Sequence, residues 1–256
     1  MSLALALPTR RVEEWKYSDL GHALGDGGFG EETARAVVPS VPAGVEIFAL
    51  DSPNKPYWVK AHYGKLGANP VSALSLAKAL GGVAIRVPKG RVIEEPLTLD
   101  FAGEGHVRAL LVLEEGAALT LSERADAADT RNVGLEIVLG QNARLEHIRL
   151  SPASGAVQVE EISMTLARDA HYRGHFANFG AKLSRTELEI ALEGEGAEAH
   201  LSGVSVLSGS RHAGVTTRVT HAVGHTQSTQ LFKNVAGGNA KAVYQGKVIV
   251  AHGANG

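Results

Sequence analysis

From residue 83 onward, apolar and polar residues alternate along the chain with a period of two. Alternation of this kind places successive side chains on opposite faces of a β-strand. It therefore predicts a series of strands that each bury one face. The apolar or β-branched positions that mark them are Leu97, Leu99 and Phe101; Val107, Ala109, Leu111 and Leu113; Leu135, Ile137 and Leu139; Ile162, Met164 and Leu166; Leu188, Ile190 and Leu192; and Val215, Thr217 and Val219.

Turn signatures recur between these strands, each pairing a residue that tolerates positive φ with an alanine. From Gly90 through Ala117, Ala143, Ala170 and Ala197 to Gly224, the steps are 27, 26, 27, 27 and 27 residues. A near-constant step of this length indicates a stacked repeat in which each coil buries its apolar face on its neighbours. The sequence thus predicts a β-helix whose turns lie in register along one edge.

Two points about this repeat stay open from the pattern alone. The alternative fold is an antiparallel sandwich, although its hairpins usually recur every 8 to 12 residues. The last interval, from Gly224 to Ala240, is only 16 residues. It predicts a shorter final coil or a different arrangement.

The first part of the chain has another character, because eight of the nine prolines precede residue 100. Residues 12–17 read as a short helix or turn, residues 25–30 as a glycine-rich break, and residues 72–80 as a helix stopped by Gly81 and Gly82. We expect a helical and irregular N-terminal segment at residues 1–81 and a β-helix core at residues 82–256.

Composition and charge narrow the possible functions. The 25 Lys and Arg against 27 Asp and Glu offer no basic field for nucleic acid or anionic lipid. The longest uninterrupted apolar run, residues 109–113, is far too short to span a membrane, and no secretory segment follows Met1. We therefore expect a cytoplasmic protein with neither nucleic acid nor membrane as partner. The absence of cysteine excludes disulfides, thiolate nucleophiles and all-protein iron–sulfur sites.

Motifs for enzyme chemistry are weak. Residues 25–30 match G-x-G-x-x-G, but a helical segment rather than a strand precedes them, so we interpret them as a loop. There is no phosphate-binding loop motif and no G-x-S-x-G nucleophile elbow. The seven aspartates are too sparse for the calcium clusters of polysaccharide-cleaving β-helices. We expect the charged connection at residues 123–126 to form a solvated face.

Histidine is the remaining candidate metal ligand. His171 and His175, and likewise His221 and His225, are four residues apart and could share a strand face. Neither pair forms an H-E-x-x-H or H-x-H motif, so we interpret them as solvated turn histidines, with a histidine metal protein as an open alternative. We assign no catalytic, cofactor-binding or metal-ligating residue.

An apolar, β-prone stretch covers residues 243–250. A β-helix end exposes unpaired backbone groups and needs a cap or a partner. Tyr244, Val248 and Val250 are therefore our candidate interaction residues, and we expect the chain in isolation to form a homodimer or larger species. In the alternative interpretation these valines only fill the coil interior.

Several stretches together resemble the SufB/SufD family of iron–sulfur cluster assembly scaffolds, and its SufD branch in particular. They are Leu7-Pro8-Thr9-Arg10 with Glu14-Trp15-Lys16-Tyr17-Ser18 and Leu20; Val87-Pro88-Lys89-Gly90 with Pro96-Leu97; Asn142-Ala143-x-Leu145-x-His147-Ile148; and Val219-Thr220-His221 with Ser228, Gln230-Leu231, Lys233 and Ala242-Val243-Tyr244-Gln245-Gly246-Lys247-x-x-Val250. The resemblance covers nearly the whole chain.

The resemblance implies a right-handed parallel β-helix behind a small helical segment. It also implies a non-catalytic scaffold subunit that pairs with SufB and works with the ATPase SufC. No cofactor is then expected on this chain alone, and an iron–sulfur cluster is implied only in the assembled complex.

Family members continue past this point with further coils and a helical region that docks the ATPase. They also carry a late His-Gly-Ala-Thr-like motif whose histidine is implicated as a ligand in cluster assembly. His252-Gly253-Ala254 lies too far upstream for that motif, so the family's ligand role is not carried onto His252. The chain thus reads as C-terminally truncated. The competing hypothesis is a β-helix enzyme acting on carbohydrate or acyl substrates, yet neither a hexapeptide rhythm nor clustered carboxylates are present.

Overall fold

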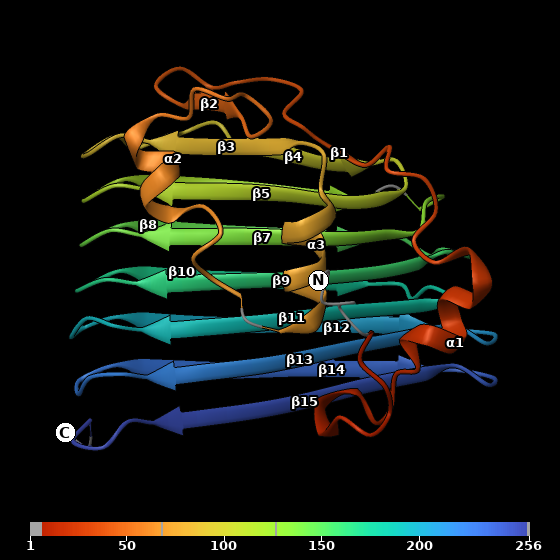
Figure 1. Ribbon diagram of the computed structural model, residues 1–256. Coiled ribbons are helices and arrows are strands. Elements are labelled where there is room, and N and C mark those ends of the chain that lie inside the picture. Colours follow the sequence, from red (N-terminus) through yellow and green to blue (C-terminus); the bar gives the residue numbers. More distant parts are fainter. Residues whose placement is uncertain (1–6, 68, 126, 255–256) are drawn as a thin grey trace, which may run out of the picture.

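The computed structural model describes residues 7–67, 69–125 and 127–254 as a stack of β-coils with short helices along one side (Figure 1). The strands form two sheets. Sheet A contains β1 (Arg35–Val37), β4 (Leu97–Ala102), β6 (Ala118–Ala125), β8 (Arg144–Ser151), β10 (His171–Asn178), β12 (Glu198–Leu207) and β14 (Gln227–Ala236). Sheet B contains β2 (Glu46–Ala49), β3 (Gly82–Val87), β5 (Gly105–Leu113), β7 (Arg131–Leu139), β9 (Val157–Leu166), β11 (Leu183–Leu192), β13 (His212–His221) and β15 (Lys241–Val250).

The chain passes alternately between the two sheets, so that strands β3 to β14 make six turns of a β-helix. Within each sheet these strands pair in parallel, with Arg144 opposite His171 and His171 opposite Glu198, 27 residues apart at each step. In Figure 1 the sheet B strands in front run leftward, the sheet A strands behind run rightward, and the coils descend, which makes the winding right-handed. Parallel pairing confirms the β-helix and excludes the antiparallel sandwich.

One edge of the stack is a column of aligned turns. Its residues have φ between 54° and 74° and are Gly90, Gly116, Asn142, Asp169, Gly196 and His225. Backbone hydrogen bonds connect neighbouring turns, as from the N–H of Gly116 to the carbonyl of Gln141 at 2.8 Å. The predicted edge of turns is confirmed, with a shift at both ends of the series. Gly90 aligns with Gly116 rather than Ala117, and Thr226, which precedes the pair Gln227 and Glu198, aligns with Ala197 in place of the expected Gly224.

The prediction of a shortened last coil was wrong. The turn at Gly238 belongs to the opposite edge, where the N–H of Asn239 donates to the carbonyl of Gly209 at 2.8 Å. The interval from residue 224 to residue 240 therefore spans β14 between the two edges. The strand that follows, β15, pairs with β13 along all ten of its residues.

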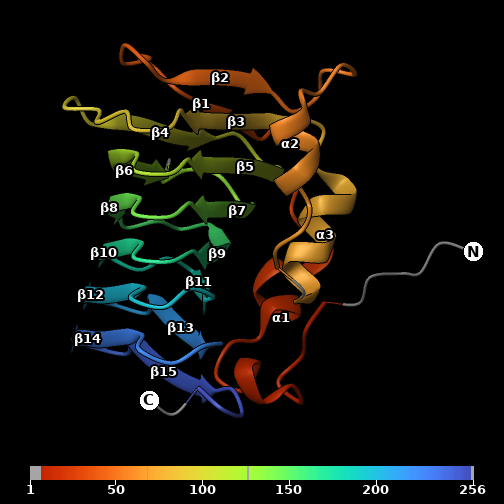
Figure 2. The same cartoon turned by 90° about the vertical axis from the view of Figure 1, so that its left-hand side faces the viewer.

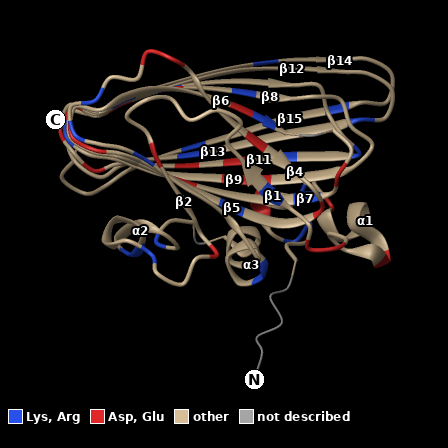
Figure 3. Cartoon of the chain, turned by 90° about the horizontal axis from the view of Figure 1, so that it is seen from above, with Lys and Arg blue, Asp and Glu red and all other residues tan. Residues whose placement is uncertain are grey.

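The N-terminal segment supplies the helices η1 (Glu13–Trp15), α1 (Leu20–Leu24), η2 (Gly25–Gly27), α2 (Tyr57–His62) and α3 (Pro70–Lys78). Helices α2 and α3 lie against sheet B (Figures 2 and 3). Helix α3 starts two residues before the predicted helix, because Asn69 caps its first amides and Pro70 needs no N–H donor there. In the described part of the chain, no helix is long and apolar enough to cross a membrane.

Candidate functional site

A cluster of charged and polar side chains lies inside the coils. Glu123 on β6, His147 on β8 and Tyr172 on β10 come from successive strands of sheet A, and each is fully buried. Arg149 on β8 and Glu160 on β9 of sheet B complete the cluster. Glu123 therefore corrects the expectation of a solvated connection at residues 123–126: β6 continues to Ala125 and points Glu123 inward, while Asp126 is outside the described residues.

The partners of Glu123 determine its charge. Its carboxylate accepts hydrogen bonds from Arg149 Nε at 2.8 Å and from His147 Nε2 at 2.9 Å. Burial by itself would raise the pKa of Glu123, but the Arg149 guanidinium and His147 lower it to about 2. Glu123 is therefore ionised inside the coils.

The two other acidic groups of the cluster, Glu160 and Tyr172, remain protonated. Burial raises the pKa of Glu160 well above its usual range, with Glu123 adding to the effect and Arg149 opposing it. Burial likewise raises the pKa of the Tyr172 hydroxyl, which donates to His147 Nδ1 at 3.0 Å. The cluster thus places the Glu123 carboxylate against the Arg149 guanidinium, and it connects β6 and β8 of sheet A to β9 of sheet B. We interpret the cluster as a structural contact that fixes how these coils pack in the interior.

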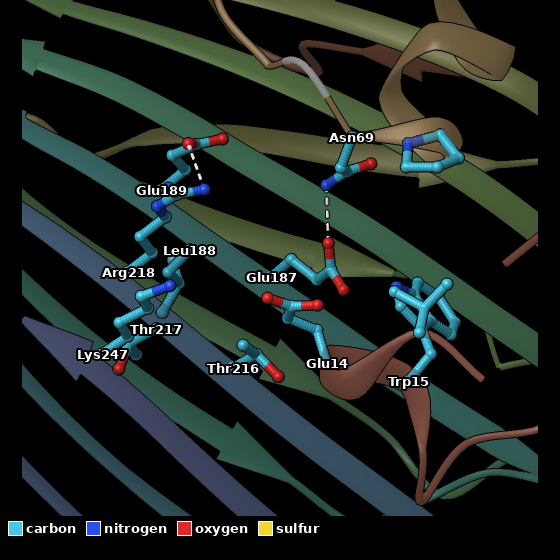
Figure 4. Close-up of a pocket in the computed structure, with 12 residues that line it drawn as sticks. Glu14, Trp15, Asn69, Glu187, Leu188, Glu189, Thr216, Thr217, Arg218 and Lys247 are labelled. Atoms are coloured by element: carbon cyan, nitrogen blue, oxygen red, sulfur yellow. Dashed lines mark hydrogen bonds and ion pairs between the residues drawn. The ribbon is translucent and has the colours of Figure 1, made fainter. Parts of the chain in front are cut away.

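A pocket of about 240 Å³ opens on the outer face of sheet B, between η1, the start of α3 and strands β11, β13 and β15 (Figure 4). Glu187 accepts hydrogen bonds from Asn69 Nδ2 at 2.6 Å and from Arg185 Nη2 at 2.9 Å. Burial raises the pKa of Glu187, while Arg185 opposes the rise. Across the pocket, Glu189 forms an ion pair with Arg218 at 3.8 Å. The bond from Asn69 to Glu187 and a bond from Arg185 Nη2 to the carbonyl of Glu14 at 2.7 Å thus hold the N-terminal segment on β11.

The candidate interaction residues lie on β15, the last strand of the described stack. Tyr244, Val248 and Val250 stand opposite Val215, Val219 and His221 of β13. Val215 and Val219 belong to the interior core, so the three β15 side chains continue the interior column. The Tyr244 ring stacks on Phe232 at 4.6 Å, and its hydroxyl donates to Gln230 Oε1 at 2.7 Å. Val248 and Val250 are each at least half exposed.

The histidine pairs differ from the expected turn residues. His171 and His175 lie in strand β10, where parallel pairing with β8 and β12 continues through both positions. His171 Nδ1 lies 3.3 Å from a carboxylate oxygen of Glu198 and His175 Nε2 lies 3.6 Å from one of Glu146, both on the outer face of sheet A.

The second histidine pair, His221 and His225, occupies the expected turn only in part. His221 is the last residue of β13 and is hydrogen-bonded to the hydroxyls of Thr226 and Ser228. His225 does occupy a turn. Within residues 7–67, 69–125 and 127–254, no group of three potential ligands is arranged to hold a metal ion.

The interior cluster was missed by sequence reasoning, although a signal for it exists. Glu123 comes two residues after Leu121, and His147 two residues after Leu145. On a strand, this spacing places a charged side chain on the buried face. An alternation that continues with a charged residue at an apolar position therefore indicates a buried polar group that needs a partner.

Taken together, the fold and these sites define a right-handed parallel β-helix with a polar interior cluster and no cysteine in its sequence. The family described as "SUF system FeS cluster assembly, SufBD core domain" matches residues 101–256. The chain belongs to this family, as the resemblance predicted.

Individual relatives agree with this assignment. The chain is 29% identical to "Iron-sulfur cluster assembly SufBD family protein slr0076" of Synechocystis, over 73% of this chain and 46% of the relative. It is 28% identical to the SufD protein of Escherichia coli, over 69% of this chain and 45% of the relative. It is 24% identical to the SufB protein of Bacillus subtilis, over 70% and 41%. The chain therefore matches less than half the length of these relatives, and it matches both named branches of the family.

Proposed function

We propose that the chain is a non-catalytic scaffold subunit of an iron–sulfur cluster assembly complex, on the SufD-like side of the family. In this proposal it works in the cytoplasm, pairs with a SufB-like subunit and is served by a SufC-like ATPase. Membership of the SufBD family over residues 101–256 is the observation that carries the proposal.

The lack of cysteine supports a scaffold role in which a partner subunit supplies the thiolate ligands of the cluster. Protein-bound iron–sulfur clusters are normally held by cysteine thiolates, and this sequence has none. The cluster would be the cargo of the complex, with its thiolate ligands supplied by the SufB-like partner. The chain would contribute a rigid surface against which the partner is placed.

We further propose that the exposed end of the stack at β15 takes part in this pairing. Val248 and Val250 present apolar surface on β15, whose second edge pairs with no strand in the described residues. Such an edge can pair with a strand of another chain. Tyr244 would hold the strand in position through Phe232 and Gln230.

Co-expression tests the assignment directly. The tagged chain is produced together with the SufB-like and SufC-like proteins of the same organism and purified under anaerobic conditions. We expect one complex containing all three, with iron and sulfide in the complex and none in the chain purified alone. A chain that stays alone while the other two associate, or a stable brown holoprotein made from this chain alone, would contradict the proposal.

A further inference from the structure

The two sheets differ in how their outer faces are covered. Sheet B has α2 and α3 packed on it, whereas no helix of the described chain lies over sheet A at β8, β12 and β14 (Figures 2 and 3). On these strands, several large apolar side chains point away from the interior and are between 41% and 61% exposed. They are Ile148, Leu150, Val204, Val206, Leu231 and Val235, which we call the open face.

The open face is hollowed rather than flat. Two adjoining hollows of about 510 and 330 Å³ share Leu150. Parallel pairing places Ala177 between Leu150 and Val204, so a small side chain stands between two larger ones. The larger hollow is also lined by Gly203. Together they form one apolar groove that crosses the strands.

The ionisable side chains that line this groove are all basic, and the carboxylate of Glu146 lies beside it, 3.6 Å from His175. The ionisable residues lining the two hollows are Arg149, His175, Lys233 and Arg211, and no carboxylate is among them. Arg149 is turned inward to Glu123 and Glu160. Among the described residues, neither Lys233 nor Arg211 has a carboxylate partner. Arg211 instead donates to the carbonyls of Ser208 and Phe179 at 3.1 and 2.9 Å.

The size of the groove matches a short helix. From β8 to β14 there are three strand spacings of about 4.8 Å each, or about 14 Å. A helix of about ten residues covers this length at about 1.5 Å per residue. Sheet B provides an internal precedent, because the nine-residue α3 packs across β5, β7 and β9.

We propose that the open face binds an amphipathic helix of a partner protein, with acidic side chains flanking its apolar stripe. The apolar stripe would fill the groove along Leu150, Ala177 and Val204, and the acidic side chains would meet Lys233 and Arg211. A second copy of this chain is a poor occupant, because its own open face would bring the same cations together. The proposal concerns sheet A and does not depend on the proposed function.

Two synthetic peptides provide the probe. Each has about 18 residues, long enough to form a helix in water, and the same leucines at i, i+3, i+4 and i+7. One carries glutamates beside the leucine stripe and the other carries lysines. By fluorescence anisotropy, we expect the glutamate peptide to bind at least about tenfold more tightly, and the difference to shrink at high salt.

Variants locate the binding site on the protein. The double change Val204→Glu with Leu231→Glu should weaken binding of the glutamate peptide at least about tenfold. Gln227→Glu adds the same type of charge on β14 outside the groove and should leave it unchanged. Lys233→Glu alone, at an exposed position, should abolish the preference for the glutamate peptide, because the new carboxylate offsets Arg211, even if the double variant does not fold.

Three results would overturn the proposal: equal affinity for both peptides, binding that survives both groove variants, or a homodimer that dissociates when Val204 and Leu231 are changed. The last result would make the open face an interface between copies of the chain. Sedimentation of the wild-type and variant chains distinguishes that outcome, and circular dichroism verifies that each variant is folded.

Discussion

Two buried glutamates, one on each sheet, show how strongly local partners decide ionisation. Glu123 faces Arg149 and His147, and its pKa falls to about 2. Glu161, on β9, has only neutral hydrogen-bond donors: Ser163 Oγ, which donates to its Oε1 at 2.7 Å, and the hydroxyl of Ser72. Burial therefore raises the pKa of Glu161 to about 7, with Glu187 adding to the effect.

Glu161 should make the folded state sensitive to pH. The folded chain holds a proton on Glu161 that the unfolded chain releases above about pH 4.5, so stability falls as the pH rises through the interval up to about 7. Between pH 5 and pH 8 we expect wild type to lose about 2 kcal/mol of unfolding free energy relative to Glu161→Gln. Urea unfolding of both proteins at each pH gives this difference.

A matched control is Glu193→Gln, which removes an exposed carboxylate just after β11 that does not contribute to the pKa of Glu161. It should leave the pH dependence of wild type intact. Equal pH profiles for wild type and Glu161→Gln would show that Glu161 does not hold the proton.

Arg149 balances the interior charge, and its removal should be costly. Arg149→Met leaves Glu123 buried without its cation, so we expect a loss of about 3 to 5 kcal/mol of unfolding free energy. Arg173→Met removes an exposed arginine from the adjacent strand and should cost less than about 1 kcal/mol. Thermal and urea unfolding compare the two, and similar losses would mean that the interior pair is not a stabilising contact.

At the scale of elements, buried polar contacts attach the helices to sheet B in addition to apolar packing such as that of Val71 and Val59. Glu136 on β7 accepts hydrogen bonds from the backbone N–H groups of Gly64, Lys65 and Leu66 at 2.9 to 3.0 Å. The same carboxylate pairs with Arg108, both side chains being 1% exposed. Arg108 Nη1 in turn donates to Ser75 Oγ of α3 at 2.8 Å. One ion pair therefore holds both α3 and the loop before it.

Glu136→Gln should release this attachment without unwinding the coils. The substitution leaves Arg108 buried without its anion and weakens the bonds to the loop. We expect backbone amides in residues 57–78 to exchange with deuterium at least about tenfold faster, while the core strands keep their protection. Glu46→Gln, which removes an exposed carboxylate from β2, should leave residues 57–78 unaffected. Loss of protection throughout the strands would mean that the helices and coils unfold as one unit.

At the scale of the whole molecule, the end of the stack at β15 should govern self-association. Lysines at Val248 and Val250 place charge on the apolar edge and discourage strand pairing. We expect the purified chain to be a dimer or larger, and Val248→Lys with Val250→Lys to shift it toward monomer. Light scattering gives the mass, and circular dichroism verifies that the last coil is folded.

Val235→Lys is the control, since Val235 is equally exposed but lies on the outer face of sheet A. It should leave the mass unchanged. A wild-type chain that is monomeric at high concentration would contradict the prediction.

The sequence by itself determined the repeat. Alternation and positive-φ turns are local properties, so strand positions such as 107–113 and the 27-residue spacing could be read along the chain. The N-terminal helix before Gly81 was predicted for the same reason, to within two residues.

Tertiary structure alone decided which polar residues are buried. Glu123 meets Arg149 from the next coil and Glu160 from the other sheet, and the outer face of sheet B becomes interior only where the N-terminal segment covers it. His171 and His175 read as turn residues because only the pairing with β8 and β12 places them in a strand. These outcomes depend on contacts between distant parts of the chain, whereas alternation records only which way each side chain points.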